Sequence, residues 1–342
     1  MKRSVDELRN LNTISWSNLG NQSIVSLARL PALRKAVFEL PSDFPTYIER
    51  LPPHSPTMKP TFSRLRILGI THRDFASVTA LLNNFEFHLM EDVRITSHYT
   101  SPSTSMQGFF AALASSSSHK TIRCITVYDE LRGLGPDLTR FELGFYELRP
   151  LLQFEMLTYL NLRFVGLIIL EDATLLKMAD AWPHITSLHL NGRGPWHPGS
   201  HINPLTFIKV LERCPKLDEL NVPMDFSAVD YVDFDPWLLD DLRNQDRKRA
   251  ELSLLWLGPY IAVHPHAVAK FLAAVLPRLA DIKMLAHNSS DPVACVQSWT
   301  QTEHIYRNIC YEQRKANFGK DNIAPVSGEE PSLSWARRRK KG

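Results

Sequence analysis

Ten large or polar residues recur at alternating positions of short apolar segments, where they could bind the surface of a protein. These residues are Arg94, Tyr128, Tyr159, Asn161, Arg163, His189, Asn191, Glu219, Asn221 and Trp256. Tyrosine, tryptophan and arginine supply much of the binding energy in protein interfaces, because they bury a large area and keep a polar group. Their types therefore predict a binding surface, with Tyr159, Arg163 and Trp256 as its strongest members.

Catalytic and cofactor motifs are missing from the sequence. It has no Gly-x-Ser-x-Gly turn, no His-Glu-x-x-His pair and no phosphate-binding loop. Segment 192–199 is rich in glycine, but its spacing differs from that of a dinucleotide loop, and Pro195 and Pro198 would interrupt the helix that holds a pyrophosphate. We therefore interpret it as a surface loop and expect neither enzymatic activity nor a cofactor.

Metal ligands and disulfides are also not expected. The histidine pairs at 197/201 and 264/266 have no cysteine or carboxylate at ligand spacing. The aspartates between 225 and 241 lack the glycine and the final glutamate of a calcium loop, so they predict a solvated acidic loop, with docking of a basic partner as the alternative. Cys124, Cys214, Cys295 and Cys310 stand far apart and are predicted to be free thiols.

The candidate binding residues belong to a recurring phrase with apolar first, fourth and sixth positions. The phrase is clearest at Leu157-Thr-Tyr-Leu-Asn-Leu, Ile185-Thr-Ser-Leu-His-Leu and Leu217-Asp-Glu-Leu-Asn-Val. An apolar period of two predicts a strand. Nine copies recur at a mean interval of about 31 residues. They begin at Leu33, Leu65, Met90, Ile122, Leu157, Ile185, Leu217, Leu252 and Leu279. A weaker first copy is predicted at Leu8, Leu11 and Thr13.

Segments with a helical period connect these strand phrases. Examples are 175–182, 205–214 and 268–279, in which apolar residues recur at steps of three and four and form one apolar face. Prolines at 31, 183, 215 and 277 each lie two residues before a copy, and we expect them to stop the helix and force an extended approach to the strand. Strand and helix units at a fixed interval predict an α/β solenoid.

The interruptions of the period divide the chain. Residues 1–290 are predicted to form one solenoid of about nine to ten irregular repeats, with surface loops at 41–60 and 223–249. Residues 291–316 have helical periodicity and are predicted to cap the solenoid, since terminal units need a face toward water. Residues 317–342 are polar and are predicted to be a disordered basic tail.

Charge and hydropathy exclude some classes of partner. The chain has 39 basic and 36 acidic residues, and five of the basic ones lie together at 337–341, so the rest is close to neutral and no nucleic-acid partner is expected. No apolar run is long enough to cross a membrane and the first residues do not resemble a signal peptide, which predicts a cytoplasmic or nuclear protein. The run at 337–341 is typical of a nuclear-import signal or of a tether to an anionic surface.

The period of two also assigns the candidate residues to one face of the sheet. Core residues occupy the first, fourth and sixth positions of each copy, so the third, fifth and seventh positions point the other way. The ten candidates all occupy those positions. Adjacent copies would therefore place them side by side on the concave surface of the solenoid.

Four short phrases that lead into strand copies carry a family resemblance. They are Leu30-Pro-Ala-Leu, Trp182-Pro-His-Ile, Cys214-Pro-Lys-Leu and Leu276-Pro-Arg-Leu. Over about residues 8–312 the chain resembles the leucine-rich-repeat region of fungal F-box proteins. The resemblance implies a ribonuclease-inhibitor-like horseshoe with parallel strands on the inner face and helices outside. An F-box normally precedes such repeats, and residues 1–30 contain no match to its Leu-Pro-x-Glu start.

Two functions follow from this resemblance. The first is a non-catalytic recognition module, similar to the substrate-binding half of an F-box ubiquitin-ligase receptor, that holds a protein on its concave face. Ubiquitin-ligase subunits would be further partners if an F-box exists upstream. The alternative is a structural scaffold of leucine-rich repeats without any coupling to a ligase.

Overall fold

The computed structural model describes residues 9–17, 19–50, 59–98, 103–116, 120–129, 142–163, 168–190, 200, 202–226, 252–257, 262–284 and 292–318. The main sheet contains β1 (Thr13–Trp16), β2 (Lys35–Glu39), β4 (Ile67–His72), β6 (Asp92–Ser97), β7 (Cys124–Asp129), β8 (Tyr159–Arg163), β9 (Ser187–Leu190), β10 (Glu219–Val222), β11 (Leu254–Leu257) and β12 (Asp281–Met284). A small second sheet pairs β3 (Thr61–Phe62) with β5 (Glu86–Phe87).

Helices connect most of these strands. They are α1 (Asn21–Leu27), α2 (Phe44–Arg50), α3 (Phe75–Asn84), α4 (Ser103–Ser116), α5 (Phe145–Leu148), the 3-10 helix η3 (Arg149–Gln153), α6 (Asp172–Ala181), α7 (Pro204–Arg213), α9 (Pro265–Val275) and α10 (Pro292–Phe318). Local signals start several of them: the Asp74 side chain accepts a hydrogen bond from the Ser77 amide ahead of α3, and Pro204 and Pro265 stand at the first positions of α7 and α9.

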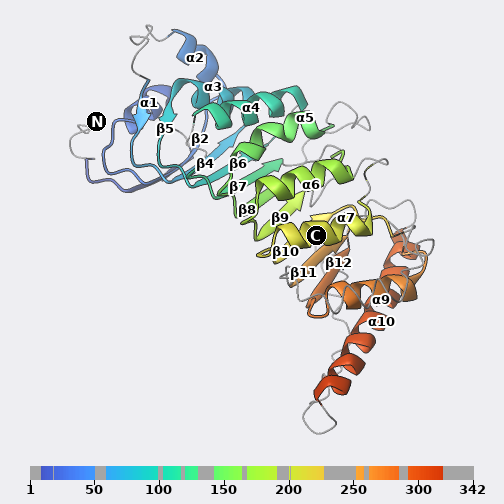
Figure 1. Ribbon diagram of the computed structural model, residues 1–342. Helices are drawn as coiled ribbons and strands as arrows, with labels where there is room; N and C mark the ends of the chain where they lie inside the picture. The colour runs from blue at the N-terminus through green and yellow to red at the C-terminus, as the bar shows by residue number, and fades with distance from the viewer. Residues whose placement is uncertain are drawn as a thin grey trace, which may run out of the picture.

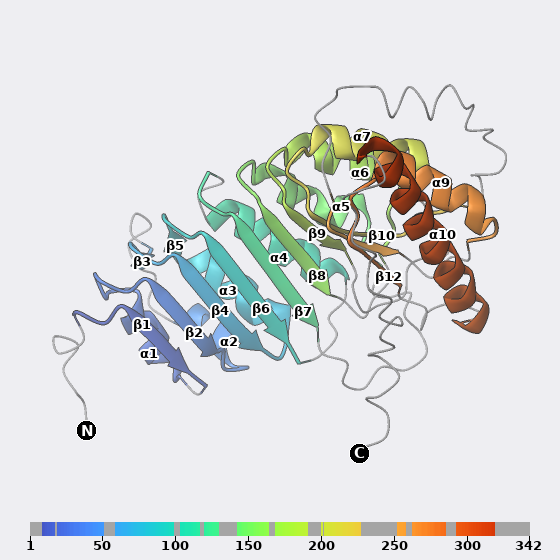
Figure 2. The same ribbon diagram turned by 90° about the horizontal axis from the view of Figure 1, so that it is seen from below.

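The main sheet is parallel and its strands are adjacent in chain order. Within the described residues it has 10 strands, ordered β1-β2-β4-β6-β7-β8-β9-β10-β11-β12. Parallel neighbours need a crossover, and helices α3, α4, α6 and α7 all lie on the same face of the sheet (Figures 1 and 2). The predicted α/β architecture, a parallel sheet with helices on one side, is confirmed. The leucine-rich-repeat horseshoe stays a prediction.

The strand register aligns the sequence copies position by position. Leu160 pairs with Leu188, Leu188 with Leu220, and Leu220 with Leu255, all of which are fourth residues of their copies. The fourth and sixth positions from β2 to β11 are buried, and they form one apolar core with the buried faces of the helices. Burying each large apolar side chain contributes roughly 1.5–3 kcal/mol, so this core is the main source of stability.

The prolines before the strand copies lie in tight turns. The amide of Leu33 bonds to the carbonyl of Leu30, and Ile185, Leu217 and Leu279 repeat this bond to Trp182, Cys214 and Leu276. In each turn proline is the second of four residues, the position that its fixed φ favours. The chain therefore does not approach the strand in an extended conformation, as expected, but passes from helix to strand through a turn whose second residue is the proline.

The first residue of each turn fills a buried row between neighbouring repeats. Trp182 is completely buried, and its Nε1 donates a hydrogen bond of 3.2 Å to the carbonyl of Leu151 in the preceding repeat. In the next repeat the thiol of Cys214 lies 3.7 Å from the carbonyls of Ala179 and Trp182. In the small sheet the equivalent rings of Phe62 and Phe87 stack with centroids 5.2 Å apart.

Two sequence predictions need correction. The first copy is Leu11, Ile14 and Trp16 rather than Leu8, Leu11 and Thr13, because Ile14 pairs with Ala36 and Trp16 with Phe38. Segment 41–60 is not a simple loop, since it contains α2, which buries Phe44. Of the predicted loop at 223–249, residues 227–249 lie outside the described residues, and Met224 and Phe226 at its start are buried.

Helix α10 closes the C-terminal end of the sheet. It covers the helix expected at 291–316 and extends to Phe318. Its buried residues Trp299, Tyr306 and Cys310 join the core, and the Tyr306 hydroxyl donates to the carbonyl of Leu276 at 2.7 Å. Of the tail predicted at 317–342, residues 317 and 318 belong to α10, and residues 319–342 lie outside the described residues.

A buried histidine predicts loss of stability in acid. Burial lowers the pKa of His72 from its ordinary 6.5 to about 4, and the ring lies edge-on against Phe75 with centroids 4.6 Å apart. Between these two values the unfolded chain binds a proton that the folded chain does not. Stability is therefore complete above pH 6.5 and falls by roughly 3 kcal/mol as the pH approaches 4.

Urea unfolding of the wild type and of His72→Phe between pH 4 and 7 measures this effect. The variant should lose stability less steeply over this interval. Substitution of the exposed His88 by glutamine is the control, and its free energy of unfolding should depend on pH in the same way as that of the wild type. Equal slopes for the wild type and His72→Phe would contradict the assignment.

Candidate functional site

The candidate site lies on the sheet face opposite the helices, which we call the open face. The fifth positions of the copies form one continuous row across it, because strand pairing joins each to the next. This row contains Gly69, Arg94, Thr126, Asn161, His189, Asn221, Trp256 and Lys283. Of the ten predicted residues, Asn191 lies outside the described residues.

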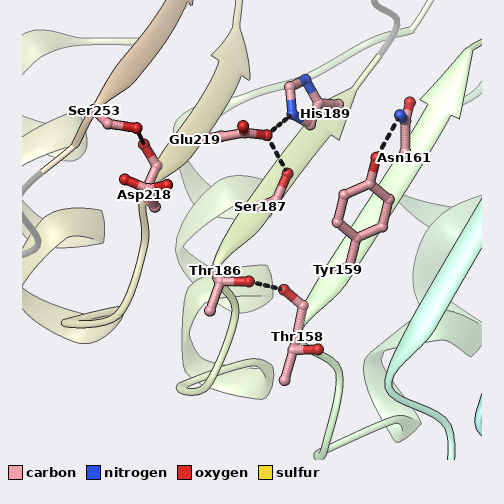
Figure 3. A network of polar contacts seen from close by, with 9 residues as sticks. All are labelled: Thr158, Tyr159, Asn161, Thr186, Ser187, His189, Asp218, Glu219 and Ser253. Carbon is pink, nitrogen blue, oxygen red and sulfur yellow. Dashed lines mark hydrogen bonds and ion pairs between the residues drawn. The ribbon is translucent and has the colours of Figure 1, made fainter. Parts of the chain in front are cut away.

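The centre of the open face is a hydrogen-bonded cluster on β9 and β10 (Figure 3). Oε2 of Glu219 lies 2.9 Å from Oγ of Ser187, which donates to it, and 2.9 Å from Nε2 of His189. The hydrogen bond with His189 lowers the pKa of Glu219, and the hydrogen bond from Ser187 and the charge of Lys283 act in the same direction. The carboxylate therefore stays ionised and fixes the orientation of His189.

Aromatic rings flank this cluster on both sides. The ring centroid of His189 lies 6.4 Å from that of Tyr159 and 6.4 Å from that of Trp256. Lys283 places its Nζ 4.9 Å from the centroid of the Trp256 ring, which is the geometry of a cation–π contact. The result is a band of aromatic side chains across β8 to β11 with a carboxylate at its centre.

The two predicted arginines of the open face, Arg94 and Arg163, each contact a neighbouring side chain. Arg94 is exposed, and its Nη2 lies 2.7 Å from the carboxylate of Asp92 on the same strand. The guanidinium of Arg163 lies 5.2 Å from the ring centroid of Tyr128 on the neighbouring strand. Both arginines thus already have partners within the protein, and a binding partner would have to share or replace them.

Four polar atoms of the fifth-position row have no hydrogen-bond partner within the described part of the chain. They are Oδ1 of Asn161, Oδ1 and Nδ2 of Asn221, and Nε1 of Trp256, all of them buried. The other amide atom of Asn161, Nδ2, donates to the Tyr159 hydroxyl at 3.0 Å, as Figure 3 shows. A buried polar atom without a partner costs about 1–3 kcal/mol. Such atoms therefore gain most from a ligand that brings matching donors and acceptors.

Some contributors to this surface were missed by the sequence prediction. Ser187 and Asp92 occupy third positions and Lys283 a fifth position, so the same period of two places them on the open face. The prediction named only selected large or polar members of the copies. Applying the period to every copy would have found all three.

The cluster differs in its order from a hydrolytic triad. In a triad, histidine stands between the nucleophile and the acid and accepts the proton of the nucleophile. Here Glu219 stands between Ser187 and His189, so the Ser187 proton points at a carboxylate. This order does not activate Ser187 as a nucleophile.

Thiol and metal chemistry has little support among the described residues. Burial raises the pKa of Cys124 to about 11 and that of Cys214 to about 12, so both are protonated thiols near neutral pH. The four cysteines are free, and the described residues contain no group of three or more histidine, cysteine, aspartate or glutamate side chains that could hold a metal ion. The glycine-rich segment 192–199 and the acidic residues 230–241 lie outside the described part.

Comparison with known proteins does not place the chain in a family. No protein-family model matches it, and no curated protein matches it significantly. Among the helices that the structure describes, none is long and apolar enough to cross a membrane. The geometry of the open face is therefore the main guide to function.

Proposed function

We propose that this chain is a non-catalytic protein-recognition module that holds a protein partner on the open face. The observation that supports it best is the band of Tyr159, His189 and Trp256 across adjacent strands, with Glu219 at its centre. Aromatic side chains and charged groups next to unsatisfied polar atoms are typical of the centre of a protein interface.

The proposed fold for this function is the leucine-rich-repeat solenoid that the sequence predicts. Repeats aligned in register along one parallel sheet support it, and the open face would be the concave inner surface. The phrases at Trp182 and Cys214 resemble fungal F-box proteins, so the chain would correspond to their substrate-binding half. In such a receptor the open face selects the protein to be ubiquitinated.

Replacing Tyr159, Arg163 and Trp256 together by alanine tests the binding surface. All three are partly buried on the open face, so the variant should fold and lose its captured proteins. Affinity purification followed by mass spectrometry compares wild type and variant, and circular dichroism verifies folding. A triple substitution of Arg64, Lys209 and Lys270 by alanine is the matched control, because these side chains are exposed and lie in a turn and on helices α7 and α9, outside the open face. Retention of every partner by the folded triple variant would refute the proposal.

The same purification separates the receptor from the scaffold. Recovery of cullin-ligase subunits with the full-length protein favours the ubiquitin-ligase receptor. Recovery of open-face partners without such subunits favours a structural scaffold that has no coupling to a ligase. In both outcomes the open face is the binding surface, so this comparison tests only whether the module is coupled to a ubiquitin ligase.

A further inference from the structure

The unsatisfied polar atoms of the open face could form hydrogen bonds with the main chain of a bound polypeptide. Trp256 Nε1 can only donate, whereas the Asn221 side chain presents a donor and an acceptor. A peptide group presents the same pair, N–H and C=O. Asn161 adds an acceptor, because its Nδ2 is already bonded to Tyr159. Two acceptors and two donors are thus available to a polypeptide main chain.

The spacing of these residues selects one main-chain conformation. Asn161 and Asn221 stand two strands apart in the register, on β8 and β10, which corresponds to about 10 Å. A polyproline II helix repeats every three residues, or about 9.3 Å. An extended strand repeats its facing side chains every ~6.7 Å. The peptide groups of an α-helix are satisfied within the helix itself.

The aromatic band supports the same class of partner. Polyproline II segments dock in grooves lined by aromatic rings, because the rigid segment loses little entropy on binding. Tyr159, His189 and Trp256 line the row on β8, β9 and β11, and Trp256 carries an indole N–H that can donate to a proline carbonyl.

From these observations, and resting on the proposed function above, we infer that the open face between β8 and β11 binds a proline-rich polypeptide segment in the polyproline II conformation. The segment crosses the strands. Its carbonyls accept from Trp256 Nε1 and Asn221 Nδ2. Main-chain N–H groups of non-proline residues, three residues apart, donate to Oδ1 of Asn161 and Asn221.

The side chains around the row must move for this contact. Asn161 and Asn221 are only 3% and 1% exposed. Lys283 covers the Trp256 ring, and the Tyr159 hydroxyl lies against Asn161. Lys283 has a long flexible side chain, so it can be displaced at low cost to uncover Trp256.

The probe is a fluorescent (Pro-Pro-Ala)4 peptide, which forms polyproline II and offers one N–H every three residues. Its affinity for the full chain is measured by fluorescence anisotropy beside (Gly-Ser-Ala)4, which has the same length. We expect at least tenfold tighter binding of (Pro-Pro-Ala)4. Decaproline, which lacks N–H groups, should bind with intermediate affinity. Equal affinity for (Pro-Pro-Ala)4 and (Gly-Ser-Ala)4 would overturn the inference.

Two variants test the assigned atoms. Trp256→Phe keeps an aromatic ring and removes the donor, and Asn221→Leu keeps the approximate shape and removes both the donor and the acceptor of the amide. Each should weaken (Pro-Pro-Ala)4 binding about tenfold, whereas Lys35→Gln on the exposed part of β2 should have no effect. If Trp256→Phe, verified as folded, binds like the wild type, the inference fails.

This failure differs from failure of the proposed function. A protein that captures partners through Tyr159, Arg163 and Trp256 but ignores (Pro-Pro-Ala)4 would still be a recognition module. Its partner would then be a folded surface or a helix rather than a proline-rich segment.

Discussion

Replacing Leu188 by aspartate should unfold the middle of the main sheet. Leu188 is only 2% exposed and pairs in register with Leu160 on one side and Leu220 on the other. The substitution removes roughly 1.5–3 kcal/mol of apolar burial. It also places an unpaired charge in the core, at a cost of several kcal/mol. Because folded domains are stable by only about 5–15 kcal/mol, we expect loss of cooperative folding.

Thermal unfolding followed by circular dichroism measures this outcome. His184→Asp is the control, because His184 is exposed in the turn just before the same strand. It introduces the same charge within four residues and should leave the transition nearly unchanged. An unaltered midpoint for Leu188→Asp would show that the fourth positions do not face the core.

Substitution of Trp182 by alanine should cost about 3–5 kcal/mol. Among the described residues this side chain and that of Trp299 are the two largest buried ones, and the Nε1 of Trp182 bonds to the Leu151 carbonyl, 31 residues away in the sequence. Alanine leaves a cavity between α6 and η3 and removes the hydrogen bond to the Leu151 carbonyl, which still accepts from the Phe154 amide. Both effects weaken the packing of α6 against η3.

Urea denaturation of Trp182→Ala and Trp182→Phe separates the loss of unfolding free energy into a packing contribution and a hydrogen-bond contribution. Trp182→Phe keeps most of the volume, so its smaller loss, about 0.5–1.5 kcal/mol, measures mainly the lost hydrogen bond to the Leu151 carbonyl, which still accepts from the amide of Phe154. Trp16→Ala is the matched control, because Trp16 is 60% exposed at the edge of the sheet and should cost less than about 1 kcal/mol. Equal losses at Trp182 and Trp16 would refute the role of Trp182 between repeats.

The fold was predictable where the apolar pattern is strong. At Leu160, Leu188 and Leu220 the copy predicts the strand, its register and its buried face. The pattern failed at the first copy, where an edge strand leaves Trp16 exposed and the apolar signal is weak. It failed also at α2, a seven-residue helix that buries only Phe44 and therefore has no readable period.

The candidate site was predictable as a face but not as an arrangement of contacts. A period of two assigns Asn161, His189 and Asn221 to the open face, yet it says nothing of their exposure, and all three are buried. It also does not show that Arg94 pairs with Asp92 or that Arg163 covers Tyr128. These contacts depend on side-chain rotamers and on the neighbours that surround each group.

For β2, β4 and β6 to β12, the sequence alone determined which residues are strand, which face of each strand is apolar and which copies are neighbours. Those properties follow from local periodicity and from the shortness of the connections. Only the tertiary structure decided that Ser187 and His189 share the carboxylate of Glu219, 32 and 30 residues away. It also decided that the side-chain amide of Asn221 and Nε1 of Trp256 have no hydrogen-bond partner among the described residues. A hydrogen bond needs atoms about 3 Å apart in a defined direction, and folding alone brings such distant residues to that distance.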